Sequence, residues 1–341
     1  MRRRDYPSRS VRLIDPFGVG GGPDLIARAV AVPLSELWGQ PVTVENHPGA
    51  GSTAGPALVA RSAADGYTLL VSTSAHAYGA AFKASLPYDP LADFVPIAPL
   101  TSQPYVLVAS MHLGVTTLAE LISAAKTRPD AIRFSSSGMG TATHVAVEKL
   151  NLEVLIEAVH VPARGTDAIT DTISQTVAGQ TDYALSPISV ALPHIREHRL
   201  APLGVSTSRR SRLLPTVPTL AEAGAAAFDF PVWYGLWAPV GTPARAVREL
   251  SESIARVLTD PALRGRLRDH DADDAHVADG LRAICTERER KRRTHHRSQR
   301  PTLDRSRLEA ARDSNHALGP LSRLGGRRAY LNSLVAKPRR W

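Results

Sequence analysis

A glycine-rich segment near the beginning of the chain has the residue types that could bind an anion. The short apolar sequence VRLID (11–15) is followed by PFGVGGGPD (16–24), and apolar residues then recur at helical spacing over 25–37. Glycine adopts turn conformations that side chains disfavour. The first backbone N–H groups of a helix, at the positive end of its dipole, attract carboxylates and phosphates. The same residues also fit a plain strand–helix connection, and the segment alone leaves both interpretations open.

Hydroxyl-bearing residues follow two other predicted strands. Ser72, Thr73 and Ser74 lie at the end of the strand predicted at 67–73, and SSSGMGTATH (135–144) overlaps the end of the strand predicted at 132–137. Ligands of doubly wound sheets bind at the carboxyl ends of the strands, so these hydroxyls are candidates for a polar ligand. They also fit ordinary turns, and His144 also fits a residue that packs against its own helix.

Strands and helices alternate along the chain, which predicts an α/β protein. Helices are expected near 25–37, 55–64, 118–127, 190–198 and 243–258, and from Thr141 and Asp167 onward. Strands separated by helices favour parallel sheets with right-handed crossovers. Pro33 lies inside the first helix, where it should cause a kink or divide the helix in two.

The strand–helix pattern begins again near Thr101, which predicts two lobes that face a cleft, each a mostly parallel sheet flanked by helices. We assign residues 11–100 and 236–268 to the first lobe and residues 101–235 to the second. Residues 1–10 precede the first lobe and residues 269–341 follow it.

The charge is unevenly distributed. The chain of 341 residues has a formal net charge of +9, but residues 281–341 hold 17 Lys and Arg against 5 Asp and Glu, which leaves 24 against 27 in residues 1–280, a net charge of −3. The folded body is therefore mildly acidic, and we expect no nucleic-acid partner for it. The single cysteine, Cys285, excludes a disulfide framework or a cysteine-based metal site within one chain.

The two ends of the sequence differ from the body. Residues 1–10 carry positive charge with no apolar stretch behind them, so no secretory signal is recognised as written. No apolar run approaches the length of a membrane span. Residues 269–341 are densely charged without periodicity, which predicts disorder. We also hypothesise that this tail comes from a shifted reading frame, which would make the product a damaged member of its family.

Eight sequence segments in order over residues 6–268 resemble one family, the Bug/TctC proteins. These segments are PFGVGGGPDLIAR, PVTVENHPGAGSTAG, DGYTLLVSTSAHA, LPYDPLADFVPIAPL, SSSGMGTATH, VPARGTDAITD, ALPHIREHRLAPLGVSTSRRSRLLPTVPTLAEAG and VWYGLWAPVGTP. Members are the extracytoplasmic solute-binding proteins of tripartite tricarboxylate transporters. The resemblance implies a two-lobed, type II-like periplasmic-binding-protein fold. It also implies a small carboxylated solute in the interlobe cleft, closure by a hinge, membrane subunits of the transporter as partners and a periplasmic location. The expected function is solute capture and delivery without enzymatic activity, cofactor or metal.

The resemblance also carries candidate ligand-binding residues. They are Phe17, Gly20, Gly21, Gly22, Asp24, Gly51, Ser52, Ser72, Thr73, Ser74, Ser137, Gly138, Thr141, His144, Arg164, Gly165 and Ser186. Phe17 is expected to form an apolar wall and the three consecutive glycines to donate backbone N–H groups. Asp24 is expected to cap the helix rather than to contact an anion, since like charges repel.

Three positions depart from the family pattern. Pro23 stands where Thr or Ser is common, which removes one N–H and one hydroxyl. Ala163-Arg164-Gly165 replaces Tyr-Lys-Gly and so lacks an aromatic ring of the cleft. Ser186 stands where Asp is frequent, which removes a negative charge. The family's solutes therefore cannot be copied to this chain.

The main alternative is a nicotinamide-dinucleotide oxidoreductase. Glu45 lies about 20 residues beyond the glycine-rich turn, where a ribose-binding acid would stand. The fingerprint fails at Pro23, where it requires glycine. No Gly-x-Ser-x-Gly elbow or phosphate-binding loop is present. His194 and His198 could share a helix face as metal ligands, but no third ligand is apparent.

Overall fold

The structure is a computed structural model that describes residues 6–49, 51–78, 86–128, 131–163 and 168–272. By its internal contacts the chain divides into a unit of residues 1–281 and a unit of residues 282–341. Every described residue belongs to the first of these units. Of the predicted tail, only residues 269–272 are described. Arg164 and Gly165 lie outside the described residues.

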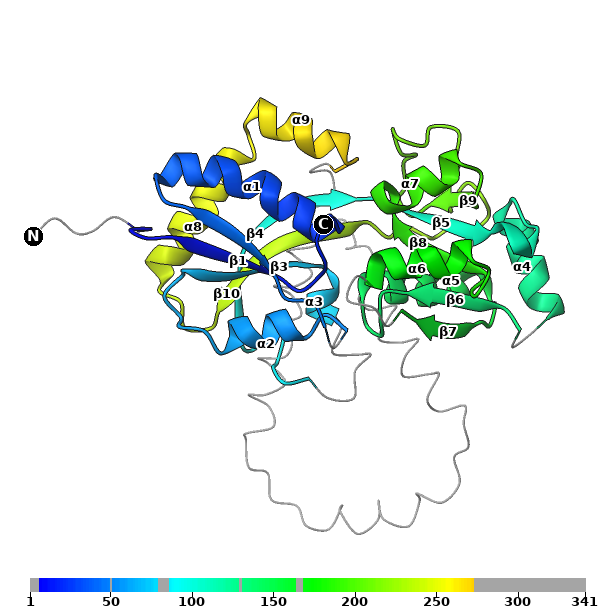
Figure 1. The fold of residues 1–341 in the computed structure, drawn as a ribbon, viewed down its shortest axis with the longest axis horizontal. Helices are drawn as coiled ribbons and strands as arrows, with labels where there is room; N and C mark the ends of the chain where they lie inside the picture. Colours follow the sequence, from blue (N-terminus) through cyan, green and yellow to red (C-terminus); the bar gives the residue numbers. More distant parts are fainter. Residues whose placement is uncertain (1–5, 50, 79–85, 129–130, 164–167, 273–341) are drawn as a thin grey trace, which may run out of the picture. The chain divides into compact units, whose positions relative to one another are not determined.

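The first of two sheets has five strands in the order β2-β1-β3-β10-β4 (Figure 1). Its strands are β1 (Val11–Asp15), β2 (Val42–Asn46), β3 (Thr68–Thr73), β4 (Phe94–Gln103) and β10 (Val232–Pro239). β1 pairs in parallel with both β2 and β3, whereas β10 runs antiparallel to β3 and β4. The sheet is therefore mostly parallel with one reversed strand.

The second sheet repeats this arrangement in the order β7-β6-β8-β5-β9. Its strands are β5 (Tyr105–Ser110), β6 (Arg133–Ser136), β7 (Val159–Pro162), β8 (Tyr183–Pro187) and β9 (Leu200–Val205). β6 pairs in parallel with β7 and β8, and β5 is the reversed strand between β8 and β9. Two mostly parallel sheets flanked by helices confirm the predicted α/β, two-lobed fold class.

The chain passes between the sheets twice. β4 belongs to the first sheet and β5 to the second, and only Pro104 separates them. The return runs from β9 in the second sheet to β10 in the first (Figure 1). In each sheet the reversed strand is thus the one that arrives from the other sheet. The residue limits proposed above for the two lobes stay a prediction.

Helices cover the sheets. They are α1 (Gly22–Trp38), α2 (Ala54–Ala60), α3 (Ala75–Tyr78), α4 (Leu118–Thr127), α5 (Ala142–Val154), α6 (Ala168–Val177), α7 (Ile188–Arg196), α8 (Ala244–Val257) and α9 (Pro261–Asp269). α1 begins with Pro23 in its first turn and ends at Gly39, whose φ of 61° favours glycine. It is assigned as one helix through Pro33, so the alternative of two shorter helices was wrong. α2 ends at Ala60 rather than near residue 64, because the chain turns at Arg61.

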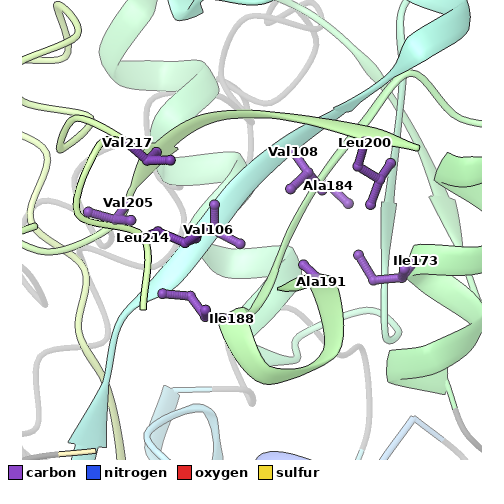
Figure 2. Packing of buried hydrophobic residues seen from close by; sticks show 10 residues of the cluster. All are labelled: Val106, Val108, Ile173, Ala184, Ile188, Ala191, Leu200, Val205, Leu214 and Val217. Atoms are coloured by element: carbon purple, nitrogen blue, oxygen red, sulfur yellow. The ribbon is translucent and has the colours of Figure 1, made fainter. Parts of the chain in front are cut away.

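A compact apolar cluster in the second lobe joins strands β5, β8 and β9 to helices α6 and α7 (Figure 2). Its members are Val106, Val108, Ile173, Ala184, Ile188, Ala191, Leu200, Val205, Leu214 and Val217. Most are β-branched or small, so they pack closely between a sheet and its helices. The cluster fixes the end of β8 and the start of α7, next to the predicted ligand residue Ser186. Within the described residues, no helix is long and apolar enough to cross a membrane.

Candidate functional site

The glycine-rich segment after β1 is anchored by the side chains of Asp15 and Asn46. Asp15 is fully buried, and its carboxylate accepts hydrogen bonds from the Phe17 N–H at 3.0 Å and from Asn46 Nδ2 at 3.1 Å. Burial raises the pKa of Asp15 well above its usual value. Asn46 Nδ2 also approaches the Phe17 carbonyl at 3.2 Å and Asp24 Oδ1 at 3.0 Å. The end of β2 thereby holds the loop that carries Phe17.

Backbone N–H groups of this segment are already engaged within it. The Gly20 N–H donates to Asp24 Oδ2 at 2.9 Å, and the Gly21 N–H points to the Gly18 carbonyl at 3.3 Å. Burial raises the pKa of Asp24, but hydrogen bonds from Arg28, the Gly20 N–H and Asn46 outweigh it, so the net shift is downward. Asp24 therefore organises the first turn of α1, although the N-cap residue itself is Gly21. Donation from Gly20 and Gly21 to a ligand stays a prediction, and it requires the loop to rearrange.

Gly22 has a packing role. A Cβ atom built on it would clash with the Tyr234 hydroxyl and lie 3.2 Å from Gln103 Oε1. Tyr234 donates its hydroxyl hydrogen to Gln103 at 2.7 Å, and Gln103 donates to the His270 carbonyl at 2.7 Å. Gln103 is the last residue of β4 and Tyr234 lies in β10, so the start of α1 packs where the chain passes between the sheets.

A cavity of about 30 Å³ lies between the two lobes. It is lined by Phe17, Gly51, Ser52, Pro56, Ser72, Thr73, Ala75, His76, Leu86, Tyr88, Gly140 and Thr141. The first ten belong to the first lobe, and Gly140 and Thr141 precede α5 in the second. A Cβ built on Gly138 would lie 3.5 Å from Gly51 Cα, so loops of both lobes are in close contact beside the cavity. None of these lining residues carries a charged carboxylate, ammonium or guanidinium group.

Hydroxyl groups of the second lobe form a closed network before α5. The Thr141 hydroxyl donates to the Gly138 carbonyl at 2.7 Å, and Ser137, Thr141 and Thr143 are joined through their Oγ atoms at 2.9–3.2 Å. Thr141 is the N-cap residue of α5, but its side chain makes no capping hydrogen bond. The network shapes a loop whose Gly140 and Thr141 border the cavity, at the positive end of a 13-residue helix.

His144 lies one turn into α5, and its ring supports the same loop. The Gly140 N–H donates to His144 Nδ1 at 3.2 Å, and His144 Nε2 is 3.6 Å from Glu148 Oε1. The ring also packs against His160 with centroids 4.2 Å apart. Burial lowers the pKa of His160 to about 4, and His160 Nε2 lies 2.6 Å from Ser136 Oγ. The described contacts of His144 are therefore with its own loop and helix and with rings of the neighbouring strands β6 and β7.

The structure brings six of the predicted residues to the cavity, from four loops and both lobes. These are Phe17, Gly51, Ser52, Ser72, Thr73 and Thr141. Eight other predicted residues do not line it: Gly21, Gly22, Asp24, Ser74, Ser137, Gly138, His144 and Ser186. Gly20 instead faces a separate surface cavity beside α7. The Ser186 hydroxyl is buried and directed to the Pro187 carbonyl at 3.4 Å.

Six of the twelve residues of the cavity wall were not among the predicted site residues, and two of these six, His76 and Tyr88, have titratable side chains. His76 lies two residues after Ser74 and Tyr88 stands in the turn-rich segment before β4, and both line the cavity. Burial lowers the pKa of His76 to about 3 and raises that of Tyr88 to about 12, so both are neutral at neutral pH. A histidine just beyond the carboxyl end of a strand was the available signal for the first.

Among the described residues, no group of three or more His, Cys, Asp or Glu side chains could hold a metal ion. His194 and His198 do not share a helix face, because α7 ends at Arg196 and His198 has a φ of 55°.

Comparisons with known proteins agree on one family. The sequence model of the tripartite tricarboxylate transporter family receptors (TctC) matches residues 26–293, beyond Arg268 where the resemblance seen in the sequence ended. Protein BugT of Bordetella pertussis is 35% identical over 261 residues, which cover 76% of this chain and 79% of BugT.

Two solved structures from Rhodopseudomonas palustris are similar throughout. Rpa4515 with adipate has a TM-score of 0.75 at 29% identity, and the match covers 85% of this chain and 97% of the Rpa4515 chain. MatC with bound malate has a TM-score of 0.73 at 33% identity, and the match covers 84% of this chain and 98% of MatC.

Proposed function

The chain belongs to the tripartite tricarboxylate transporter receptor family of periplasmic solute-binding proteins, and from this premise we propose that it captures a small dicarboxylate in the cavity between its lobes and delivers it to the membrane subunits of such a transporter. Solute-binding proteins bind and release without chemical change, so no catalytic residue is proposed.

The observation that carries the proposal is the composition of the cavity wall. Hydroxyls of Ser52, Ser72, Thr73 and Thr141 meet there with the amino end of α5. Hydroxyls, backbone N–H groups and a helix dipole stabilise a carboxylate without a buried counter-charge. The absence of charged side chains among the described lining residues argues against a cationic solute, which would need an acid to pair with.

The apolar part of the wall indicates what joins the carboxylates. Phe17, Leu86 and Tyr88 line the cavity together with the polar groups. Such a surface suits a short methylene chain. Malate bound to MatC and adipate bound to Rpa4515 are acids of this kind. We therefore propose a dicarboxylate of four to six carbons as the solute class.

Binding such an acid requires the lobes to separate first. The cavity of about 30 Å³ holds one or two water molecules, which is less than a dicarboxylate needs. Two chain passages between the sheets can serve as a hinge, as in other two-lobed binding proteins. The solute would enter the open form, and the loops at Gly51 and Gly138 would close around it less tightly than in this structure, where the cavity beside them is smaller than the acid.

The proposal is tested by titrating the full chain with malate, succinate, adipate and citrate in a calorimeter, with NAD and NADP as the alternative ligands. One acid should bind with a dissociation constant well below 1 mM. Ser72→Ala and Thr141→Val should each weaken it by about tenfold or more, since a hydrogen bond to a charged group contributes about 1.5–3 kcal/mol. Thr127→Val, at the exposed end of α4, is the matched control and should bind unchanged.

Binding of a dinucleotide, with no acid bound, would refute the proposal in favour of the oxidoreductase. Equal affinity of Ser72→Ala, Thr141→Val and the parent chain would place the acid elsewhere on the protein.

A further inference from the structure

His76 is a buried polar residue without a hydrogen-bond partner among the described residues. It lies on α3, directly after the Ser72-Thr73-Ser74 end of β3, and 7% of its surface is exposed. Both Nδ1 and Nε2 are buried and neither has a hydrogen-bond partner. The residue nevertheless lines the interlobe cavity beside Ser72 and Thr73. Buried polar side-chain atoms are nearly always paired, so this imidazole calls for an explanation.

Aromatic rings fix the orientation of the imidazole. Phe94 and Trp237 meet it edge to face, with centroid distances of 4.6 and 5.0 Å, and Tyr88 stacks beside it at 6.0 Å. A phenylalanine would make the same kind of ring contacts without burying two unpaired nitrogens. Packing alone therefore does not account for a histidine here.

The surroundings also define the form in which His76 acts. Among the described residues, the rings packed against it are those of Tyr88, Phe94 and Trp237, and the only titratable group of these three is the hydroxyl of Tyr88, which burial keeps neutral. Burial alone lowers the pKa of His76 to about 3. The ring is therefore a neutral imidazole, with one N–H donor and one acceptor nitrogen.

We propose that His76 is a specificity-determining residue of the carboxylate site, where its imidazole N–H donates a hydrogen bond to a carboxylate oxygen of the bound dicarboxylate. The proposal rests on the proposed function and names the side chain that contacts one end of the solute. It gives the buried nitrogen the partner that it lacks in the described residues. It also explains why the wall around it is aromatic, because the rings fix the direction of the donated hydrogen bond while Phe17 and Leu86 contact the methylene chain.

The experiment compares His76→Phe, His76→Asn and His76→Gln in the full chain. Phenylalanine keeps the ring contacts and removes both nitrogens, whereas the two amides place an N–H near the former Nδ1 or Nε2 position. Affinity is measured by calorimetry for whichever acid of the panel binds the parent chain, and the melting temperature without ligand is measured in parallel.

We expect His76→Phe to melt at the same or a higher temperature than the parent and to bind the acid at least tenfold more weakly, about 1.4 kcal/mol. At least one amide variant should recover most of that loss and so identify the donating nitrogen. The matched control is His194→Phe. His194 Nδ1 is also buried without a partner among the described residues, but His194 does not line the cavity, so its replacement should leave affinity unchanged.

Two results would overturn the proposal. Parent-like affinity of His76→Phe would show that the nitrogens do not contact the acid. Equal weakening in all three variants would show that restoring an N–H does not restore affinity, so the loss does not come from this hydrogen bond. If the parent chain itself binds no acid, the proposed function fails, and that outcome is separate from either of these.

Discussion

The side-chain amide of Asn46 offers the sharpest test of how the ligand loop is held. Its Nδ2 lies within 3.2 Å of Asp15 Oδ2, the Phe17 carbonyl and Asp24 Oδ1, and its two hydrogens must serve these three acceptors. Its Oδ1 accepts from Arg28 at 3.0 Å. Asn46→Ala removes all of these contacts at once, at the point where β2 ends beside the loop.

The expected cost follows from what each partner retains. Asp24 keeps the Gly20 N–H and Arg28, so it is hardly affected. Asp15 keeps only the Phe17 N–H for a carboxylate with no exposed surface. An unsatisfied buried polar group costs about 1–3 kcal/mol, and the Phe17 carbonyl loses the same donor. We therefore expect Asn46→Ala to lower the free energy of unfolding by about 3 kcal/mol, which is roughly 6–12 °C in melting temperature for a domain of this size.

Urea unfolding followed by circular dichroism measures the loss, with Glu45→Gln as the matched control on the same strand. Glu45 pairs with Arg12 at 2.7 Å, but both side chains are more than a third exposed, so its replacement should cost less than about 1 kcal/mol. A loss of under 1 kcal/mol for Asn46→Ala, or equal losses in both variants, would refute the view that this buried amide holds the loop.

Three further substitutions test other features. Because burial raises the pKa of Asp15, its carboxyl stabilises the fold most when protonated. The stability of the parent relative to Asp15→Asn should therefore fall as the pH rises above about 4, in urea titrations between pH 4 and 8. Gly22→Ala should destabilise the protein by about 1–3 kcal/mol, because its Cβ meets the Tyr234 hydroxyl; an unchanged melting temperature would contradict this. Asp271→Ala should cost about 1–3 kcal/mol, measured by thermal melting, because the buried Ser211 hydroxyl loses its acceptor.

The fold was predictable because the sequence repeats one physical pattern. Apolar runs such as VRLID and YTLLVST alternate with helices, and strands β1 and β3 coincide with these two runs. The reversed direction of β5 and β10 was not visible, since both are uniformly buried strands with no residue that encodes direction. Helix ends were also missed where a turn at Arg61 or after Arg196 ends the helix without Gly or Pro.

The candidate site was predictable only in part, because residue type does not distinguish a ligand contact from a structural one. Ser72, Thr73 and Thr141 stand at strand or helix ends, where topology alone points to a ligand. Gly22 has the same appearance as an anion-binding glycine, yet its lack of a side chain is needed for contact with Tyr234, more than 200 residues away in the sequence. His76 gave no periodic signal, since its environment is assembled from Tyr88, Phe94 and Trp237.

The register of the reversed strands links the chain passages to the candidate site. β10 enters the first sheet with Tyr234 opposite Thr73, and the Ser74 N–H donates to the Trp233 carbonyl at 2.8 Å. β5 enters the second sheet with Val106 opposite Ser186. In each sheet, the strand that has just crossed therefore pairs with the end of a strand that carries predicted ligand residues. If the lobes rotate about the two chain passages, the rotation axis lies close to these strand ends. A solute that contacts residues at both strand ends would then bind close to that axis and oppose opening. The proposed hinge therefore lies next to two of the strand ends that carry predicted ligand residues.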